Sequence, residues 1–198
     1  MRKIAVYGGS FDPPHKGHQL LAENLAKKCE AEKVIVIPTA LSPFKSTSSA
    51  TAEERLEMCR AAFDSPLFEV SDLEISRGGK SYTIDTLTEL KEKYPDAQLF
   101  LFMGDDMLLS FNKWYRYNDI LKIAKLVCAC RTRELDELEN MRVFSREALG
   151  LDENNILVCE SVPVEISSSE IRSDIDKNKN YLDNNVFEFI KSRGLYGK

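Results

Sequence analysis

The fold is decided by residues 4–18, which read Ile4-Ala5-Val6-Tyr7-Gly8-Gly9-Ser10-Phe11-Asp12-Pro13-Pro14-His15-Lys16-Gly17-His18. The apolar run at the start is typical of a buried strand, and the stretch after the two glycines opens into a helix. Glycines let backbone amides approach a ligand closely, and the first helical turn adds unpaired N–H groups and the positive end of the helix dipole. The segment therefore predicts a strand, an anion-binding loop and a helix in succession.

Strand-like and helix-like stretches alternate along the rest of the chain. We expect further strands at residues 34–37, 68–75, 99–103, 126–130 and 156–158, and helices at 17–29, 51–63, 83–94, 120–123, 135–150, 169–175 and 184–193. Thr51 followed by Glu54 indicates a capping box at one helix start, and the strand at 68–75 should lie near a sheet edge.

This alternation predicts an α/β, Rossmann-like, doubly wound fold, in which helices cover both faces of a mostly parallel sheet. We expect one domain over residues 1–198, with a small helical C-terminal part from about residue 166. Sheets of this kind bind ligands at the carboxyl ends of their strands, so functional residues should directly follow strands.

The composition describes a folded protein without a general affinity for polyanions. Of its 198 residues, 43% are hydrophobic and 30% are charged, which excludes disorder as the main state. With 27 lysines and arginines against 32 aspartates and glutamates, the net charge is −5, so neither nucleic acid nor an anionic membrane is expected as a partner. No apolar run could span a bilayer or serve as a signal peptide, so we expect a cytoplasmic protein. The state of assembly, monomer or homo-oligomer, stays open.

The five cysteines are odd in number and widely spaced, and none forms a C-x-x-C motif. We expect reduced, mostly buried thiols and neither disulfides nor a zinc site. They are Cys29, Cys59, Cys128, Cys130 and Cys159.

The only two histidines, His15 and His18, lie in the same glycine-rich turn. A single histidine is more often a surface or structural residue, but a pair in such a turn favours phosphate chemistry, because imidazoles donate to phosphate oxygens. Zinc is disfavoured because no third ligand with suitable spacing is present. The absence of G-x-G-x-x-G and of the P-loop lysine argues against a nicotinamide-dependent dehydrogenase and a P-loop kinase.

Three other segments have both a structural and a functional interpretation, and a fourth has a structural one. The serines of 167–169 could cap a helix or, with Arg172, hold phosphate; the acids of 104–106 could cap a helix or hold a ribose or metal. Trp114 could belong to a packed aromatic cluster or stack on a flat cation. Residues 81–83 taken alone indicate a helix cap.

The sequence resembles the nucleotidyltransferase α/β-phosphodiesterase superfamily over nearly its whole length, and within it most resembles the bacterial nicotinate-nucleotide adenylyltransferases. The resemblance is carried by G-S-F-D-P-P-H-K-G-H at 9–18, S-Y-T-I-D-T at 81–86, G-D-D at 104–106 with Trp114, I-S-S-S-E-I-R at 166–172 and the ending G-L-Y at 194–196. In one loop the chain departs from the family pattern, since Phe44 stands where many members have histidine, while Lys45 keeps the basic charge.

The resemblance implies an adenylyltransferase that joins ATP to nicotinate mononucleotide in NAD biosynthesis, with Mg²⁺ bridging the ATP phosphates and no protein-only metal site. Its catalytic residues would be His15, His18 and Arg172, converging on one triphosphate. The residues implied for ATP are Gly8, Gly9, Ser10, Phe11, His15, His18, Gly104, Asp106, Ser167, Ser168, Ser169, Ile171 and Arg172. Those implied for the mononucleotide are Ser10, Phe11, Lys45, Tyr82, Thr83, Asp106 and Trp114, whose ring would stack on the nicotinate. The resemblance also implies that the backbone amides of residues 81–83 bind the nicotinate carboxylate.

Other activities remain open at this point. Pantetheine-phosphate adenylyltransferase shares the first loop and a serine-rich late motif, but the motif at 81–86 and Trp114 argue against it. A cytidylyltransferase and a non-catalytic nucleotide-binding regulator are further alternatives. The sequence does not decide between nicotinate and nicotinamide mononucleotide.

Overall fold

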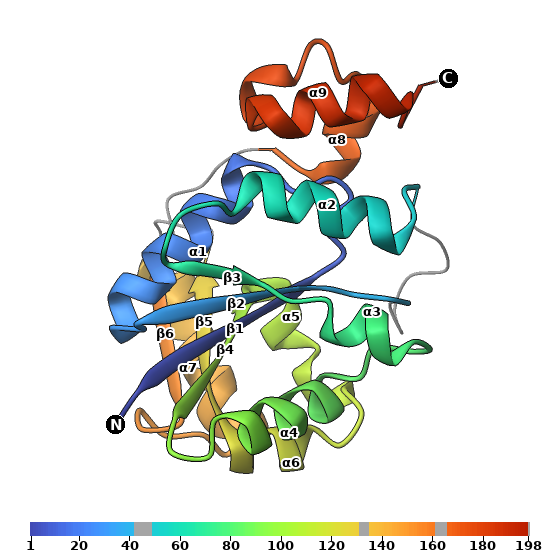
Figure 1. Ribbon diagram of the computed structural model, residues 1–198. Helices are drawn as coiled ribbons and strands as arrows, with labels where there is room; N and C mark the ends of the chain where they lie inside the picture. The colour runs from blue at the N-terminus through green and yellow to red at the C-terminus, as the bar shows by residue number, and fades with distance from the viewer. Residues whose placement is uncertain (42–48, 131–134, 161–165, 198) are drawn as a thin grey trace. The chain divides into compact units, whose positions relative to one another are not determined.

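The computed structural model describes residues 1–41, 49–130, 135–160 and 166–197 (Figure 1). Its strands are β1 (Lys3–Gly9), β2 (Lys33–Pro38), β3 (Phe68–Val70), β4 (Gln98–Gly104), β5 (Ala124–Cys130) and β6 (Ile156–Glu160). They form one parallel sheet in the order β3-β2-β1-β4-β5-β6. The α/β, Rossmann-like fold predicted from the sequence is confirmed.

Helices occupy the connections between the strands and the segment after β6. They are α1 (Lys16–Cys29), α2 (Ala52–Ala62), α3 (Leu73–Arg77), α4 (Thr83–Lys93), α5 (Asp105–Leu109), α6 (Tyr117–Ile123), α7 (Leu135–Leu149), α8 (Ser168–Ser173) and α9 (Asn184–Arg193), with 3₁₀ turns η1 (Phe111–Lys113) and η2 (Lys179–Tyr181). In the strand order, the chain winds outward from β1 to β3 and then returns to β4 beside β1. In sheets with such a reversal, ligands bind outside the carboxyl ends of the strands where the order reverses.

The chain divides into two compact units, and the expectation of a single domain stays a prediction. The first unit holds residues 1–7, 21–34 and 82–163, and the second holds residues 8–20, 35–81 and 164–198. In the first unit, the middle of the sheet is fully buried at Ile4, Leu99 and Leu126, and α4 packs against α6. In the second unit, α2 lies beside α9 (Figure 1). Met58 on α2 and Ile190 on α9 are both buried.

Most of the predicted elements are confirmed within one or two residues of their ends. The capping box before α2 is present, because the Thr51 hydroxyl accepts from the Glu54 amide while the Glu54 carboxylate accepts from the Thr51 amide. This reciprocal pair satisfies two of the N–H groups that a helix start leaves without a partner. The short helices α5, η1 and η2 carry too few residues for a periodic pattern, and the sequence did not indicate them.

The predicted strand at 68–75 is wrong in its second half. Strand β3 ends at Val70, and the chain turns into α3 at Leu73. Side chains before and within the turn provide the reason, because the Leu73 amide donates to the Ser71 hydroxyl and the Ser76 hydroxyl donates to the Asp72 carboxylate. Serine and aspartate bond nearby backbone in this way and favour turns over sheet ladders. The predicted edge position is confirmed, since β3 is the last strand of the sheet.

All five cysteines are free and buried, as the sequence predicts. Burial raises the pKa of the Cys159 thiol to about 11, and it also raises the pKa values of Cys29, Cys59 and Cys128. Since the thiolate is the reactive form, these thiols should be inert in the folded protein.

We therefore expect iodoacetamide at pH 8 to leave the native protein almost unlabelled, and mass spectrometry to find five adducts per chain once guanidinium unfolds it. Fast, stoichiometric labelling of one thiol in the native protein would contradict the burial described above.

Among the described residues, no helix combines the length and apolarity that crossing a membrane requires.

Candidate active site

The loop that follows β1 belongs to the second unit and is built around the ring of Phe11. A Cβ placed on Gly9 would lie 3.0 Å from that ring, so a side chain at this position would force the ring to move. A Cβ on Gly8 would meet no atom within 4 Å, so packing does not explain the glycine there. Phe11 itself has a φ of 47°, in the left-handed region that an aromatic residue rarely adopts. Its buried ring contacts the rings of Phe63 and His18 edge to face, and these contacts hold the strained backbone in place.

The two histidines form a stacked pair at the start of α1. Their ring centroids are 3.7 Å apart, and His15 is buried while His18 is half-buried. The His15 amide donates to Nδ1 of His18 at 3.2 Å, and the His15 carbonyl accepts from the His18 amide at 2.8 Å. The His18 side chain thus accepts from the backbone amide three residues before it, as the glutamate side chain does in a capping box. Because Nδ1 accepts a hydrogen bond, the neutral ring carries its proton on Nε2, which makes Nε2 the donor toward a ligand.

The segment around α8 lies directly on this loop, although about 155 residues separate the two in sequence. Arg172 Nη1 donates to the Asp12 carbonyl at 2.5 Å, and the Ser168 hydroxyl donates to the Pro13 carbonyl at 2.9 Å. Arg172 Nη2 also donates to the Ser169 hydroxyl at 3.1 Å, which orients the guanidinium. The structure therefore brings Arg172 to the loop that carries His15 and His18, while their joint contact with a triphosphate stays a prediction.

Ser167 caps the start of α8, which is the structural interpretation of the serine run. Its hydroxyl accepts from the Glu170 amide at 3.2 Å. The Glu170 carboxylate in turn accepts from the Ser167 hydroxyl at 2.6 Å and from the Ser167 amide at 2.7 Å, and these two bonds lower the pKa of Glu170. Ile171 is fully buried, so its side chain belongs to the core of the unit. The roles implied for Ser167 and Ile171 at ATP stay predictions, and with their side chains engaged in this way, backbone groups would have to make the contact.

The sequence analysis did not identify Arg55, whose side chain holds the backbone of the loop after β1. Only 1% of this residue is exposed, and its guanidinium donates to the carbonyls of Ser10 at 2.7 Å, Thr39 at 2.6 Å and Ala40 at 3.3 Å. Burial lowers the pKa of Arg55, and the nearby Asp12 carboxylate opposes that shift. The signal in the sequence is the position of Arg55 on the same helical stripe as three buried apolar side chains, Met58, Cys59 and Ala62.

Asp12 is the second residue that the sequence did not indicate. Its buried carboxylate accepts hydrogen bonds from the amides of Ser49 and Ala50, at 2.7 and 3.1 Å, and from the Tyr196 hydroxyl at 2.8 Å. Burial, followed by the Asp12 charge, raises the pKa of Tyr196, so its phenol keeps its proton and remains the donor. Asp12 therefore joins the loop to the start of α2 and to the C-terminal end of the chain.

In the first unit, the acidic residues predicted at nucleotide follow β4 directly. Gly104 is the N-cap of α5, and no side chain caps this helix start, so the cap interpretation of the two acids is wrong. The Asp105 carboxylate accepts from the Asp106 amide at 2.9 Å, and the side chain of Asp106 is exposed. Contact of Gly104 and Asp106 with nucleotide stays a prediction.

Trp114 sits in an aromatic cluster of the first unit and is 8% exposed. Its ring lies 5.3 Å from that of Phe111, which in turn contacts Tyr117 edge to face. The neighbouring Tyr115 is 56% exposed, and its ring lies 4.7 Å from that of Tyr82. The packed-cluster interpretation is therefore realised, and stacking of Trp114 on a ligand ring stays a prediction.

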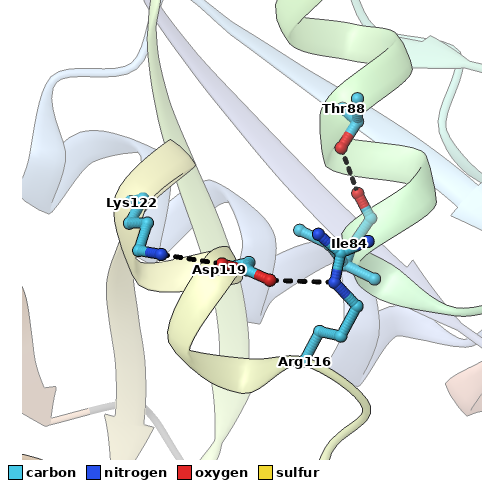
Figure 2. A network of polar contacts seen from close by, with 5 residues as sticks. All are labelled: Ile84, Thr88, Arg116, Asp119 and Lys122. Atoms are coloured by element: carbon cyan, nitrogen blue, oxygen red, sulfur yellow. Dashed lines mark hydrogen bonds and ion pairs between the residues drawn. The ribbon is translucent and has the colours of Figure 1, made fainter.

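The helix after Trp114 is fixed by a charged network (Figure 2). Arg116 adopts a left-handed conformation before α6, and Asp119 accepts from both Arg116 and Lys122 at 2.8 Å. These two bonds lower the pKa of Asp119. The network lies at the exposed start of α6, the helix that packs against α4.

The helix α4 begins at Thr83, and the cap predicted for residues 81–83 is wrong in its mechanism. Tyr82 precedes the helix without a side-chain cap bond, while the Ser81 hydroxyl accepts from the Ala40 amide at 3.0 Å. Ser81 is therefore engaged by the segment after β2. The start of α4 still presents its amides, which is the feature implied for a carboxylate ligand.

The contacts described above leave two expectations untested, the role of Lys45 and the binding of a metal ion. Lys45, with its neighbours Pro43 and Phe44, lies outside the described residues. Within residues 1–41, 49–130, 135–160 and 166–197, no group of three or more histidine, cysteine, aspartate or glutamate side chains could hold a metal ion.

Comparisons with known proteins agree with the fold and the motifs. The cytidylyltransferase-like family model matches residues 6–174. A relative from Hydrogenobaculum sp., named probable nicotinate-nucleotide adenylyltransferase, is 35% identical over 199 residues, which cover 98% of each chain. A relative of the same name from Listeria monocytogenes is 32% identical, with 99% of this chain and 98% of the relative covered.

A solved structure with a similar fold is the nicotinic acid mononucleotide adenylyltransferase of Plasmodium falciparum complexed with NaAD. It is 20% identical, with a TM-score of 0.76 and coverage of 99% of this chain and 98% of that chain. At this identity the likeness concerns the fold alone.

Proposed function

The chain belongs to the cytidylyltransferase-like family and, within it, to the nicotinate-nucleotide adenylyltransferases, and from this premise we propose that it joins ATP to nicotinate mononucleotide. The products are nicotinate adenine dinucleotide and pyrophosphate. The observation that carries the proposal in the structure is the contact of Arg172 with the loop that bears His15 and His18. A guanidinium and an imidazole donor at one glycine-rich loop suit the charge of a triphosphate.

In the proposed reaction, a phosphate oxygen of the mononucleotide attacks the α-phosphorus of ATP in line. The bond from that phosphorus to the oxygen shared with the β-phosphate breaks, and pyrophosphate leaves with the electron pair. The attacking oxygen is already anionic, so the step requires no general base. Catalysis then comes from positioning and from stabilising the charge that shifts onto the leaving group.

The family resemblance assigns each candidate residue a part in this reaction. In the second unit, His18 Nε2 would donate to the α- or β-phosphate, and His15, Lys45 and Arg172 would hold the remaining phosphates. Backbone groups of Ser10 and Phe11 would lie near the reacting centre. In the first unit, the residues assigned to nucleotide are Gly104 and Asp106, and those assigned to the nicotinate are Tyr82, Thr83 and Trp114.

Nucleotidyltransferases of this family generally use a divalent metal ion. We propose that the ion is Mg²⁺ and that it enters as part of the substrate, bridging the ATP phosphates, since Mg²⁺ commonly binds through substrate phosphates. The cytoplasmic location predicted from the sequence also stays a proposal.

The test is pyrophosphate release with ATP and each acceptor in parallel. We expect turnover with nicotinate mononucleotide and none with phosphopantetheine. We expect nicotinamide mononucleotide to be used about 10-fold less efficiently, because an amide loses the attraction of a carboxylate to a helix start. Turnover with phosphopantetheine alone would favour the sister enzyme, and no turnover with any acceptor would favour a nucleotide-binding regulator.

A further inference from the structure

The C-terminal end of the chain reaches back to the phosphate-binding loop through the hydroxyl of the half-buried Tyr196. The Tyr196 hydroxyl donates to Asp12 Oδ1 at 2.8 Å, across 184 residues of sequence, and also lies 4.0 Å from the sulfur of Met58 on α2. Nothing in the proposed reaction uses Tyr196, yet the residue makes a specific contact beside the strained part of the loop.

Tyr196 is held in place by the way α9 ends. Gly194 adopts the left-handed conformation, and the amides of Gly194 and Leu195 donate back to the carbonyls of Lys191 and Ile190. This arrangement closes the helix and turns the chain sharply, as in a Schellman motif. Tyr196 follows, also in the left-handed region at a φ of 61°. Because α9 packs against α2, the chain that carries the Tyr196 phenol leaves a helix that is itself held in place.

Asp12 transmits this contact to the groups proposed to bind phosphate. Its carboxylate receives Tyr196, while its own carbonyl receives Arg172 Nη1 at 2.5 Å. Phe11, the residue before it, carries the strained φ and packs its ring against His18. A shift of Asp12 would therefore move both the guanidinium and the imidazole.

We propose that Tyr196 is a positioning residue of the phosphate-binding loop, which acts through Asp12 to set the place of Arg172 and the strained backbone beside His18. This inference rests on the proposed function, because it assigns Tyr196 to the triphosphate half of that site. It distinguishes Tyr196 from a residue that only stabilises the fold.

The test compares two tyrosine-to-phenylalanine variants. Tyr196→Phe removes the hydroxyl and keeps the ring, whereas Tyr181→Phe removes an exposed hydroxyl from the same C-terminal segment and serves as the matched control. We expect Tyr196→Phe to lower kcat/KM for ATP about 10-fold, because displacing a catalytic group by about 1 Å can cost up to about 100-fold in rate. The KM for the mononucleotide should stay within about 2-fold of wild type, and Tyr181→Phe should match wild type throughout.

A double-mutant cycle separates positioning from stability. In an Arg172→Lys background, the further effect of Tyr196→Phe should shrink to less than about 2-fold, since contacting residues do not act additively. Asp12→Asn should also lower kcat/KM for ATP, because its amide nitrogen cannot accept from the Ser49 amide, so the side chain that receives Tyr196 would shift. Circular dichroism at the assay temperature checks that each variant is folded.

A Tyr196→Phe variant with a lowered Tm but wild-type kcat/KM would overturn the proposal, and so would full additivity with Arg172→Lys. If the wild-type protein releases no pyrophosphate with any acceptor, the proposed reaction is wrong while the positioning proposal can still be decided. Calorimetric binding of MgATP then replaces kinetics, and we expect Tyr196→Phe to raise the Kd about 10-fold. Equal Kd values for the two proteins would overturn the role of Tyr196.

Discussion

Replacing His18 with alanine should lower kcat about 100-fold or more. The His18 ring is held between His15 and Phe11, and its Nδ1 accepts from the His15 amide, so Nε2 carries the only proton that the neutral ring can donate. A preorganised donor of this kind needs no reorganisation when charge develops on the phosphates, and removing one typically costs about 100- to 1,000-fold in kcat. Steady-state pyrophosphate release at saturating substrates measures the effect.

Two amide substitutions test whether the proton on Nε2 is responsible. The amide nitrogen of glutamine lies near the position of Nε2, whereas that of asparagine lies near Nδ1. We therefore expect His18→Gln to retain about 10-fold more turnover than His18→Asn. Leu20→Ala, an exposed change on the same helix, is the control and should be close to wild type. Near-wild-type turnover in His18→Ala would refute the assigned role.

Replacing Trp114 with alanine should raise the KM for nicotinate mononucleotide about 10- to 30-fold and leave the KM for ATP nearly unchanged. The nicotinate ring of the mononucleotide is flat and cationic, and a desolvated cation over a tryptophan face contributes up to about 2 kcal/mol. Because Trp114 is the only tryptophan, its fluorescence also reports binding directly, and we expect quenching when the mononucleotide is added to the wild-type protein.

Loss of packing could imitate this result, since Trp114 also contacts Phe111. Phe111→Leu disturbs the same cluster at a fully buried position and serves as the control. If Phe111→Leu raised the KM as much as Trp114→Ala does, general loosening would explain the effect. An unchanged KM in Trp114→Ala would count against stacking. Trp114→Phe keeps an aromatic face and should fall between wild type and alanine.

Features that depend on near neighbours were predictable. The strand, glycine-rich loop and helix at residues 4–29 follow from local hydrophobic periodicity and turn chemistry. The capping box at Thr51 needs only a partner three residues away, and the fold class follows from the alternation of such elements. Where two local signals competed, as at Leu73, hydrogen bonds from serine and aspartate overrode the alternating pattern and produced α3.

The sequence alone therefore determined most of the strands and helices and the candidate phosphate-binding residues, because those depend on short-range pattern and on residue type. Only the tertiary structure decided what supports them. Arg55 reaches the Ser10 carbonyl across 45 residues, and Tyr196 reaches Asp12 across 184. Such partners are chosen by how helices pack, as α9 does on α2, and no spacing along the chain encodes which buried donor will meet which acceptor.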